Sequence, residues 1–352
     1  MDSSLNFSVA TADVLSMELD RIVFSDLDVG DSVGVRIVVY DGSNTVMDTW
    51  YNTYFADNRG CVTLSDLAKV WNSYILYRLR VSGAEDSGPA TLIGAIKVEF
   101  TYTLEDETTA TCLRRIWYSM RKDDMTVSAL NQRHPLLSLR KRTFIDASEP
   151  MYIVGPTPKT VTVYVTYLSL TGDVGTLYYN LSTTDADTFG TYRNVSPSAV
   201  ASHLQTGAKL LEYAVAIDGA TMRCTYIVDY GHHAQRTEIC YLNRWGVYET
   251  LWLLGSERWK PERSADFGYA GDEHAALDVV VEDVYETSTG YVNDTVLDQL
   301  RDIAASPSIW LWVAAASTWR KITVKSVEFE RVRPSNEVRS GMITYQFAEQ
   351  NI

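Results

Sequence analysis

Apolar and polar residues alternate along much of this 352-residue chain. The clearest case is the segment 159–170, where Val161, Val163 and Val165 are separated by a threonine and a tyrosine. A period of two is typical of a strand that is buried on one face. Similar runs, separated by turn clusters rich in Gly, Asn and Asp, occur before residue 105 and after residue 143. The pattern predicts a mainly β chain that consists of several β-sandwich-like modules. A few short helices would give it a minor α+β character.

Two segments have a helical period instead. Residues 64–79 can be capped by Thr63 or Ser65 and place Leu64, Leu67, Ala68, Trp71 and Ile75 on one face. Residues 293–306 start at the cap residue Asn293 and stop at Pro307, with Val296, Leu297, Leu300, Ile303 and Ala304 as the buried stripe. We therefore expect a few short helices among the strands.

The segment Tyr241–Gly255 predicts a hairpin. An apolar run ends at Leu242, the polar residues Asn243 and Arg244 form the turn, and a second strand runs from Trp245 to Leu254. Turn and packing residues account for this hairpin, so it supplies no catalyst.

Shifts in composition divide the chain into four parts. They are an N-terminal β domain with one helix (1–105), a basic linker or docking arm (106–142), a middle β domain (143–240) and a C-terminal β domain with one helix (241–352). The basic segment has eight Lys or Arg between Cys112 and Arg142 against only two Asp. It could dock on an acidic neighbouring subunit, contact DNA phosphates, or form a solvated linker.

Aromatic and basic residues are the candidates for an interface, because buried aromatic and Arg side chains dominate binding energies. They are Arg114, Arg115, Trp117, Tyr118, Arg140, Lys141, Arg142, Trp245, Trp252 and Trp259. For the tryptophans, packing in the core is an equal alternative.

Overall charge and hydropathy restrict the function further. A formal charge of −14 argues against DNA contact, since nucleic-acid-binding domains are usually basic. The N-terminal residues have no basic and apolar regions of a secretory signal, and no apolar run reaches the roughly 18 residues of a membrane span. The four cysteines are widely spaced, and we expect them to be reduced.

The sequence offers little catalytic or metal-binding chemistry. His232-His233 with Cys224 and Cys240 could supply zinc ligands, but a polar loop explains them as well. The acidic segments 185–190 and 272–274 are better explained as a turn and a solvated loop than as a calcium loop or an acid–base pair. No nucleophile or phosphate-binding motif is present. We expect no catalytic residue, no metal and no cofactor.

Four segments of the C-terminal part carry a family pattern. They are Tyr241–Thr250, Glu257–Ser264, Tyr285–Gly290 and Tyr345–Asn351, and the segment Trp50–Leu79 carries a looser match. In their order and spacing these segments resemble the tail and baseplate-region proteins of tailed phages and prophages of Bacteroidetes.

This resemblance implies a virion structural protein of the phage tail, near the baseplate or tail tip, assembled in the bacterial cytoplasm and without enzymatic residues. The implied partners are copies of the same chain in a ring-like homo-oligomer and neighbouring tail proteins. Two alternatives remain open. One is a receptor-recognition module that binds a host surface glycan through exposed aromatics. The other is a glycan-degrading tail enzyme, whose two carboxylates can lie anywhere in the sequence.

Overall fold

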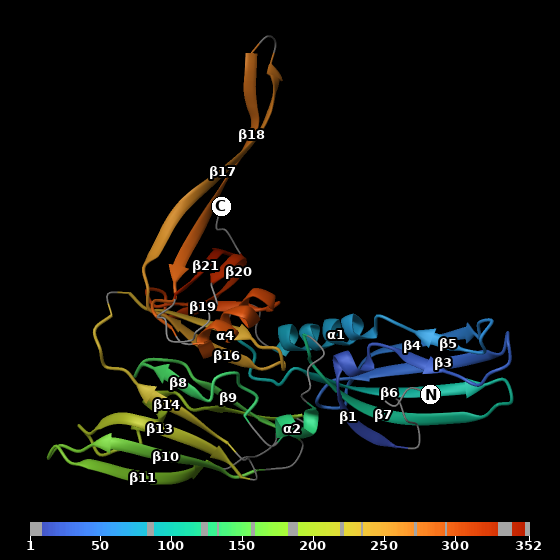
Figure 1. The fold of residues 1–352 in the computed structure, drawn as a ribbon, viewed down its shortest axis with the longest axis horizontal. Helices are drawn as coiled ribbons and strands as arrows, with labels where there is room; N and C mark the ends of the chain where they lie inside the picture. Colours follow the sequence, from blue (N-terminus) through green and yellow to red (C-terminus); the bar gives the residue numbers. More distant parts are fainter. Residues whose placement is uncertain are drawn as a thin grey trace.

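The computed structural model describes residues 9–82, 88–120, 126–131, 134–155, 159–181, 189–218, 222–233, 235–270, 273–292, 294–329 and 340–348. Strands make up 53% of the structure and helices 13%, which confirms the prediction of a mainly β fold. The strands form three lobes that follow one another in sequence and meet near the centre of the molecule (Figure 1).

The N-terminal lobe contains a five-stranded sheet. Its strands are β1 (Thr11–Leu15), β3 (Ser32–Tyr40), β4 (Val46–Phe55), β6 (Ala95–Leu104) and β7 (Thr109–Trp117), in the order β1-β7-β6-β3-β4. The helix α1 (Leu67–Ser82) packs on one face, where Trp71 and Ile75 are fully buried. This confirms the first predicted helix. The 3₁₀ helix η2 (Ser16–Leu19) and the short strands β2 (Ile22–Phe24) and β5 (Val62–Leu64) complete the lobe.

The middle lobe contains a second five-stranded sheet. Its strands are β8 (Arg140–Thr143), β10 (Val161–Leu168), β11 (Val174–Leu181), β13 (Lys209–Ile217) and β14 (Arg223–Val228), in the order β11-β10-β13-β14-β8. The strand β8 runs parallel to β14. A separate pair is formed by β9 (Pro150–Val154) and β12 (Gly190–Asn194), and two short helices are α2 (Val127–Asn131) and α3 (Pro197–Ala201).

The predicted linker 106–142 needs correction. Its first part forms β7, which is paired with β6 along its whole length, and its last residues begin β8. In β7 the residues Cys112, Arg114 and Ile116 are buried. The two arginines in a row hid this alternation, because Arg114 is a buried residue that the sequence pattern counts as polar.

The C-terminal lobe contains a seven-stranded sheet. Its strands are β15 (Thr237–Leu242), β16 (Tyr248–Leu253), β17 (Glu257–Ala270), β18 (Glu273–Ser288), β19 (Ile309–Val313), β20 (Thr318–Phe329) and β21 (Gly341–Phe347), in the order β16-β15-β19-β20-β21-β18-β17. The helix α4 (Asp294–Ala305) buries Leu297, Leu300 and Ile303, which confirms the second predicted helix. The predicted cap residue Asn293 lies outside the described residues.

Two hydrophobic cores hold the lobes. One continuous core joins the N-terminal and middle sheets and includes Trp245 and Tyr248 of the C-terminal lobe. A second, smaller core lies between α4 and the C-terminal sheet. The hairpin β15–β16 contributes to both cores, so it is the segment on which the three lobes meet. None of the described helices is long and apolar enough to cross a membrane.

Candidate functional site

The hairpin β15–β16 is wedged between lobes at its turn. The Asn243 side-chain oxygen accepts a hydrogen bond from the Trp245 backbone N–H (3.0 Å), and Gly246 has φ +74°. The Gly246 carbonyl accepts a 2.7 Å bond from the N–H of Gly94 in the N-terminal lobe. The hairpin prediction is confirmed, but the second strand begins at Tyr248 rather than Trp245 because the turn runs to residue 247.

The next turn residue, Arg244, ties the hairpin to α4. Its Nε lies 2.9 Å from each carboxylate oxygen of Asp302, and its backbone N–H donates to the same group at 3.1 Å. Both residues are buried. A buried arginine–carboxylate pair of this kind fixes orientation as well as position, because the guanidinium plane matches the carboxylate.

Glu249 on β16 collects hydrogen bonds from three parts of the chain. Its carboxylate accepts from the backbone N–H of Leu137 (3.0 Å) and Ser138 (3.2 Å), and from the side-chain amides of Asn243 (3.2 Å) and Gln299 (3.0 Å). Glu249 has no exposed surface. It therefore links the irregular segment before β8, the hairpin turn and α4.

Lys141 of β8 supplies the positive charge of this region. Its Nζ donates to Glu149 Oε2 (2.8 Å) and to Thr250 Oγ1 (2.6 Å), and the Thr250 hydroxyl donates to the same Glu149 oxygen at 2.7 Å. Burial alone would lower the pKa of Lys141, but the carboxylates of Glu149 and Glu249 raise it above its ordinary value. Lys141 is therefore a buried cation. We call Lys141, Glu149, Arg244, Glu249 and Asp302 the junction cluster.

A further buried carboxyl group lies beside the junction cluster. Glu238 of β15 accepts a 3.0 Å hydrogen bond from the backbone N–H of Ser148. Burial, with a further contribution from the charge of Glu149, raises the pKa of Glu238 well above its usual range, although the Ser148 bond and the Lys141 charge oppose the shift. The neutral acid is thus favoured here, whereas Lys141 is held charged.

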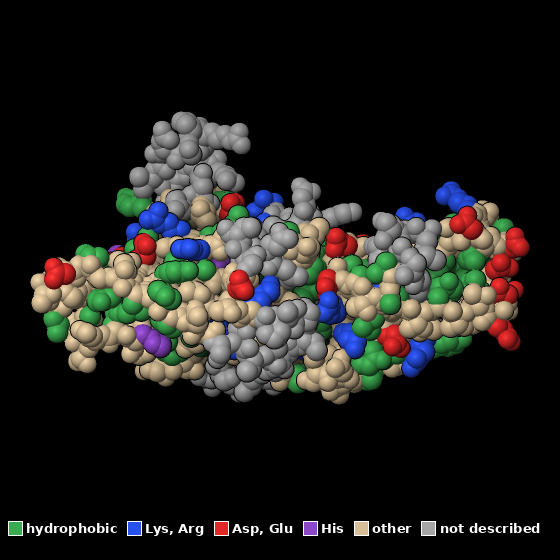
Figure 2. Space-filling view, turned by 90° about the horizontal axis from the view of Figure 1, so that it is seen from below, with side chains coloured by type: hydrophobic (Ala, Val, Ile, Leu, Met, Phe, Trp, Pro, Cys, Tyr) green, Lys and Arg blue, Asp and Glu red, His purple; other side chains and the backbone are tan. Residues whose placement is uncertain are grey.

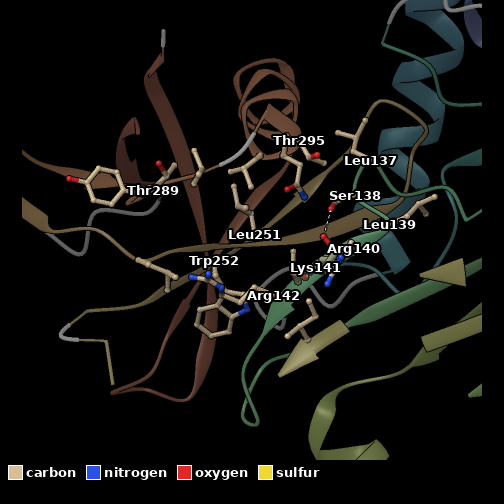
Figure 3. Close-up of a pocket in the computed structure, with 17 residues that line it drawn as sticks. Leu137, Ser138, Leu139, Arg140, Lys141, Arg142, Leu251, Trp252, Thr289 and Thr295 are labelled. Atoms are coloured by element: carbon tan, nitrogen blue, oxygen red, sulfur yellow. Dashed lines mark hydrogen bonds between the residues drawn. The ribbon is translucent and has the colours of Figure 1, made fainter. Parts of the chain in front are cut away.

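A cavity of about 700 Å³ opens next to the junction cluster (Figure 3). It lies between β8 and β16, which are the end strands of the middle and C-terminal sheets. Its walls come from residues 137–142, from Ile227, from residues 250–252 and 254, and from Thr289, Tyr291, Val292, Thr295, Val296 and Gln299. Arg140 and Arg142 are exposed, so their charges lie on its solvent side. We call this cavity the junction cleft.

Four of the predicted interface residues meet in the junction cleft. Arg140, Lys141, Arg142 and Trp252 all line it, although the tryptophan is more than a hundred residues away in sequence. Arg142 lies 3.6 Å from Asp229. The structure therefore brings together the end of the basic segment and one tryptophan of the hairpin.

Five other predicted interface residues contact the interior of the chain itself. Arg114, Trp117, Tyr118 and Trp245 are buried, and Arg115 is paired with Asp13 at 2.7 Å. The Trp117 ring packs edge-on against Phe189, and burial raises the pKa of Tyr118. The buried side chains among them therefore pack in the core of the chain and do not form a free surface. For Trp117 and Trp245 this is the alternative that their sequence context left open.

The remaining candidate, Trp259, lies on a long hairpin formed by β17 and β18. These strands pair from Glu257–Thr287 out to Ala270–Glu273, but β21 pairs with β18 only over Tyr285–Ser288. Beyond Tyr285 the described hairpin is thus a two-stranded ribbon, and Figure 1 shows it projecting away from the body. We call the part between Trp259 and Val284 the arm.

The two faces of the arm differ. Up to the register shift between Asp266 and Phe267, odd-numbered residues of β17 and β18 share the face of Tyr285, whose ring stacks on the core residue Tyr345 at 5.5 Å. Further out, this face carries Trp259, Pro261, Ala265, Val279 and Val281, with the charged Arg263 and Asp283 between them. Trp259 and Val281 are 59% and 54% exposed. The core-facing side of the sheet therefore continues outward as an exposed apolar surface.

The opposite face of the arm is charged. Lys260 lies 3.3 Å from Glu286, and Lys325 of β20 lies 3.2 Å from Glu262 and 2.9 Å from Glu282. These contacts are solvent-exposed and contribute little to stability, but they keep the face hydrophilic. The arm is thus amphipathic, with its polar face satisfied within the chain.

Sequence reasoning missed the carboxylates and the amide of the junction, namely Glu149, Glu249, Gln299 and Asp302. One signal was present. Glu249 and Thr250 are polar residues in a hairpin whose other strand residues are almost all apolar, and β15 and β16 are buried nearly throughout. A buried polar residue is informative because it needs a hydrogen-bond partner.

The residues weighed as zinc ligands, among them His233 and Cys224, lie in the described part of the chain. His233 Nε2 lies 3.0 Å from an Asp229 carboxylate oxygen, and burial raises the pKa of the Cys224 thiol to about 12. Among the described residues, no group of three His, Cys, Asp or Glu side chains could hold a metal ion. Residues 185–188 and Asp272 lie outside the described part of the chain.

Comparisons with known proteins give a structural similarity but no match to a family. No family model and no curated protein matches the sequence. A stretch covering 32% of this chain matches 92% of a chain from the solved virion of a native gene transfer agent particle, with 11% identity and a TM-score of 0.22. A TM-score this low does not establish a shared fold.

Proposed function

We propose that this protein is a non-enzymatic structural component of a phage-like virion, located in the tail near the baseplate or tail tip. It acts by assembling with copies of itself and with neighbouring tail proteins. The observation that carries this proposal is the arm, whose exposed apolar face continues the core side of the C-terminal sheet.

The physical reason is that such an arm is incomplete on its own. A two-stranded ribbon is only marginally stable in water, and contiguous exposed apolar residues mark contact sites for other molecules. The body behind it is well packed, with a continuous core through two lobes. A well-packed body with an exposed apolar extension is suited to building an assembly rather than to turning over a substrate.

The family resemblance supports the same conclusion residue by residue. Its first motif, Tyr241–Thr250, forms the junction hairpin that carries Arg244 and Glu249. Its second motif, Glu257–Ser264, lies on β17, and its third, Tyr285–Gly290, begins where the arm meets the sheet. These three motifs therefore fall on the junction, the arm and the base of the arm, while the fourth begins on β21.

The test is to locate the protein in particles. Tailed particles are purified from cells that produce this chain, and a tagged copy is located by electron microscopy. We expect the tag at one end of the tail. In a matched variant, residues 261–283 are replaced by a short Gly-containing turn; it should fold but fail to enter particles. Complete, infectious particles without the protein would contradict the proposal, as would cleavage of a polysaccharide by the purified chain.

A second candidate is binding of a surface glycan by the middle lobe. On its outer sheet face, the rings of Tyr164 and Tyr178 lie 6.3 Å apart, and the Arg223 guanidinium lies 4.4 Å above Tyr164. Tyr178 is 73% exposed. Exposed aromatic rings can stack on sugars, and the neighbouring Ala214 leaves the face flat. Binding of capsular polysaccharide that is lost in Tyr178→Ala but kept in Val174→Ala would favour this function.

A further inference from the structure

The arm and the junction cleft are complementary surfaces of the described chain. We infer that the arm of one copy enters the junction cleft of a neighbouring copy. This inference rests on the proposed assembly function and names its partner surface. Within one molecule the arm projects away from the body, so the contact has to be made between molecules (Figure 1).

The charges of the two surfaces are opposite. Among the arm side chains that the structure describes, four are acidic (Glu262, Asp266, Glu282 and Asp283) and two are basic (Lys260 and Arg263). On the cleft, Arg140 and Arg142 are exposed along the same side of β8. The chain as a whole is acidic, so two exposed arginines beside a cavity stand out as a local site for an acidic segment.

Open strand edges occur on both sides of the proposed contact. In the described residues, β8 is paired only with β14 and β16 only with β15, and both strands line the cleft. On the arm, β18 has no neighbour on its outer side before Tyr285. An extended strand can add to such an edge through main-chain hydrogen bonds. Pro261 on β17 lacks an N–H, so the β18 side of the arm is the better edge.

The apolar parts also correspond. The cleft is lined by Leu139, Leu251, Trp252 and Val292 in addition to its arginines. The arm presents Trp259, Val279 and Val281 on one face. Valines of an entering strand would cover the leucines of the cleft, while the exposed acidic residue Asp283 on the same face would lie near an arginine.

An arm-into-cleft contact joins two different surfaces of the same chain. Such a heterologous contact forms a ring when the rotation between copies closes, and a filament when it does not. The competing occupant of the cleft is the acidic free end of the N-terminal lobe (Figure 2). Glu105 and Glu107 lie in the hairpin turn between β6 and β7, and Asp26 lies in the loop between β2 and β3, so these residues offer no open strand edge and match the charge alone.

The experiment uses the full-length chain and charge reversal on exposed residues. The cleft variant is Arg140→Glu/Arg142→Glu, and the arm variant is Asp266→Arg/Asp283→Arg. Self-association is measured by sedimentation at several protein concentrations. We expect each variant alone to associate about a hundredfold more weakly than the unmodified chain, because reversal places like charges opposite each other.

Mixing the two variants is the decisive step. The reversed arm meets the reversed cleft, and each unmodified arm meets an unmodified cleft, so association should return to near its original strength. The control variant Glu105→Arg/Glu107→Arg should associate normally. Circular dichroism and thermal unfolding check that every variant is folded; if one is not, Arg140→Gln/Arg142→Gln and Asp266→Asn/Asp283→Asn replace the reversals, with weaker association of each expected.

Three results would overturn the inference: unchanged association of either variant, no recovery on mixing, or loss of association in the Glu105/Glu107 control. These results leave the proposed function intact if the protein is still found in tail particles. A chain that is monomeric alone but present in particles would likewise overturn the self-contact and not the virion role. Absence from particles would overturn the proposed function itself.

Discussion

Most proteins bury apolar side chains and expose charged ones, and the junction cluster and the arm depart from this distribution in opposite ways. The junction buries charged side chains, among them Lys141, Glu149 and Glu249, which proteins rarely bury unless they are paired. The arm exposes apolar ones, including Trp259 and Val281. In the junction every charge has an opposite charge or several hydrogen bonds within the chain. On the arm the apolar face has no covering element among the described residues.

This difference separates what the chain completes alone from what it leaves for a partner. The junction cluster draws residues from β8 and the segment that follows it, from the hairpin and from α4. Such a network costs desolvation energy. It also fixes how the joined segments are placed, because each group has only one arrangement that satisfies it. The arm has no such constraint. Its position relative to the body is set at the base, where Tyr285 packs on Tyr345, and by the solvent-exposed contacts of Lys325 with Glu262 and Glu282.

Removing the junction cation should have the largest effect on stability. Lys141→Ala leaves the Glu149 carboxylate buried with one hydrogen bond, from Thr250. Breaking a buried pair in this way costs about 3–5 kcal/mol. Urea unfolding should therefore show a much lower free energy of unfolding.

The control for this substitution lies one residue away. Arg140 is exposed on the same strand, and Arg140→Ala should change the free energy of unfolding by no more than about 0.5 kcal/mol. The double variant Lys141→Met/Glu149→Gln should recover part of the loss, since it removes both charges. Equal effects of the two single alanine variants would mean that the junction is not a charge-dependent structure.

A smaller loss is expected at the turn that joins the hairpin to the N-terminal lobe. Gly246 has φ +74°, and a Cβ there would lie 2.6 Å from the Tyr118 Cβ. Gly246→Ala combines backbone strain with a clash and should cost about 2–3 kcal/mol. Gly172 has φ +88°, and a Cβ added there would meet no atom within 4 Å, so Gly172→Ala isolates the strain alone and should cost about 1 kcal/mol. Equal losses of stability for Gly246→Ala and Gly172→Ala in thermal unfolding would contradict a close contact between the hairpin turn and Tyr118.

The buried acid Glu238 gives the junction a pH dependence. Its pKa in the folded state is raised above the ordinary value of 4.5, so the folded chain binds more protons than the unfolded chain between those two values. Its contribution to stability is therefore fully present below pH 4.5 and is lost as the pH rises through the folded pKa.

Glu238→Gln cannot ionise and should remove this loss. The variant should gain stability over the unmodified chain as the pH rises toward neutral, by about 1.4 kcal/mol for each unit of pKa shift. Urea unfolding across the pH range measures the difference. A difference that is constant with pH would show that Glu238 is ionised in the folded state as readily as in the unfolded one.

Local features of the fold could be predicted from the sequence, and contacts between distant residues could not. The helix with Trp71 and Ile75 and the hairpin with Asn243 follow from periods and turn residues within a short window. By contrast, the Lys141–Thr250 bond joins residues 109 positions apart, and nothing near either residue indicates the other. Only the accumulation of polar residues in an apolar hairpin pointed to a buried network.

The arm was hidden for a different reason. A strand ending at Val284 could be predicted from its valines, but β17 has Pro261 and several charged residues that mask its alternation. Charged residues suit a strand whose one face is in water, and a proline suits the edge of a sheet. The sequence pattern therefore indicated one strand of the ribbon and left its partner as an irregular segment.

The smallest effect on stability and the sharpest effect on association are expected from two neighbouring valines of the arm. Val280 and Val281 are 45% and 54% exposed and point to opposite faces. Val280→Asp and Val281→Asp should each change the free energy of unfolding by no more than about 0.5 kcal/mol, because neither side chain is buried. Only Val281 lies on the apolar face, so only Val281→Asp should weaken self-association, by about tenfold. If both variants associate alike in sedimentation experiments, the arm does not dock through one face, and the contrast with the internally paired junction loses its functional meaning.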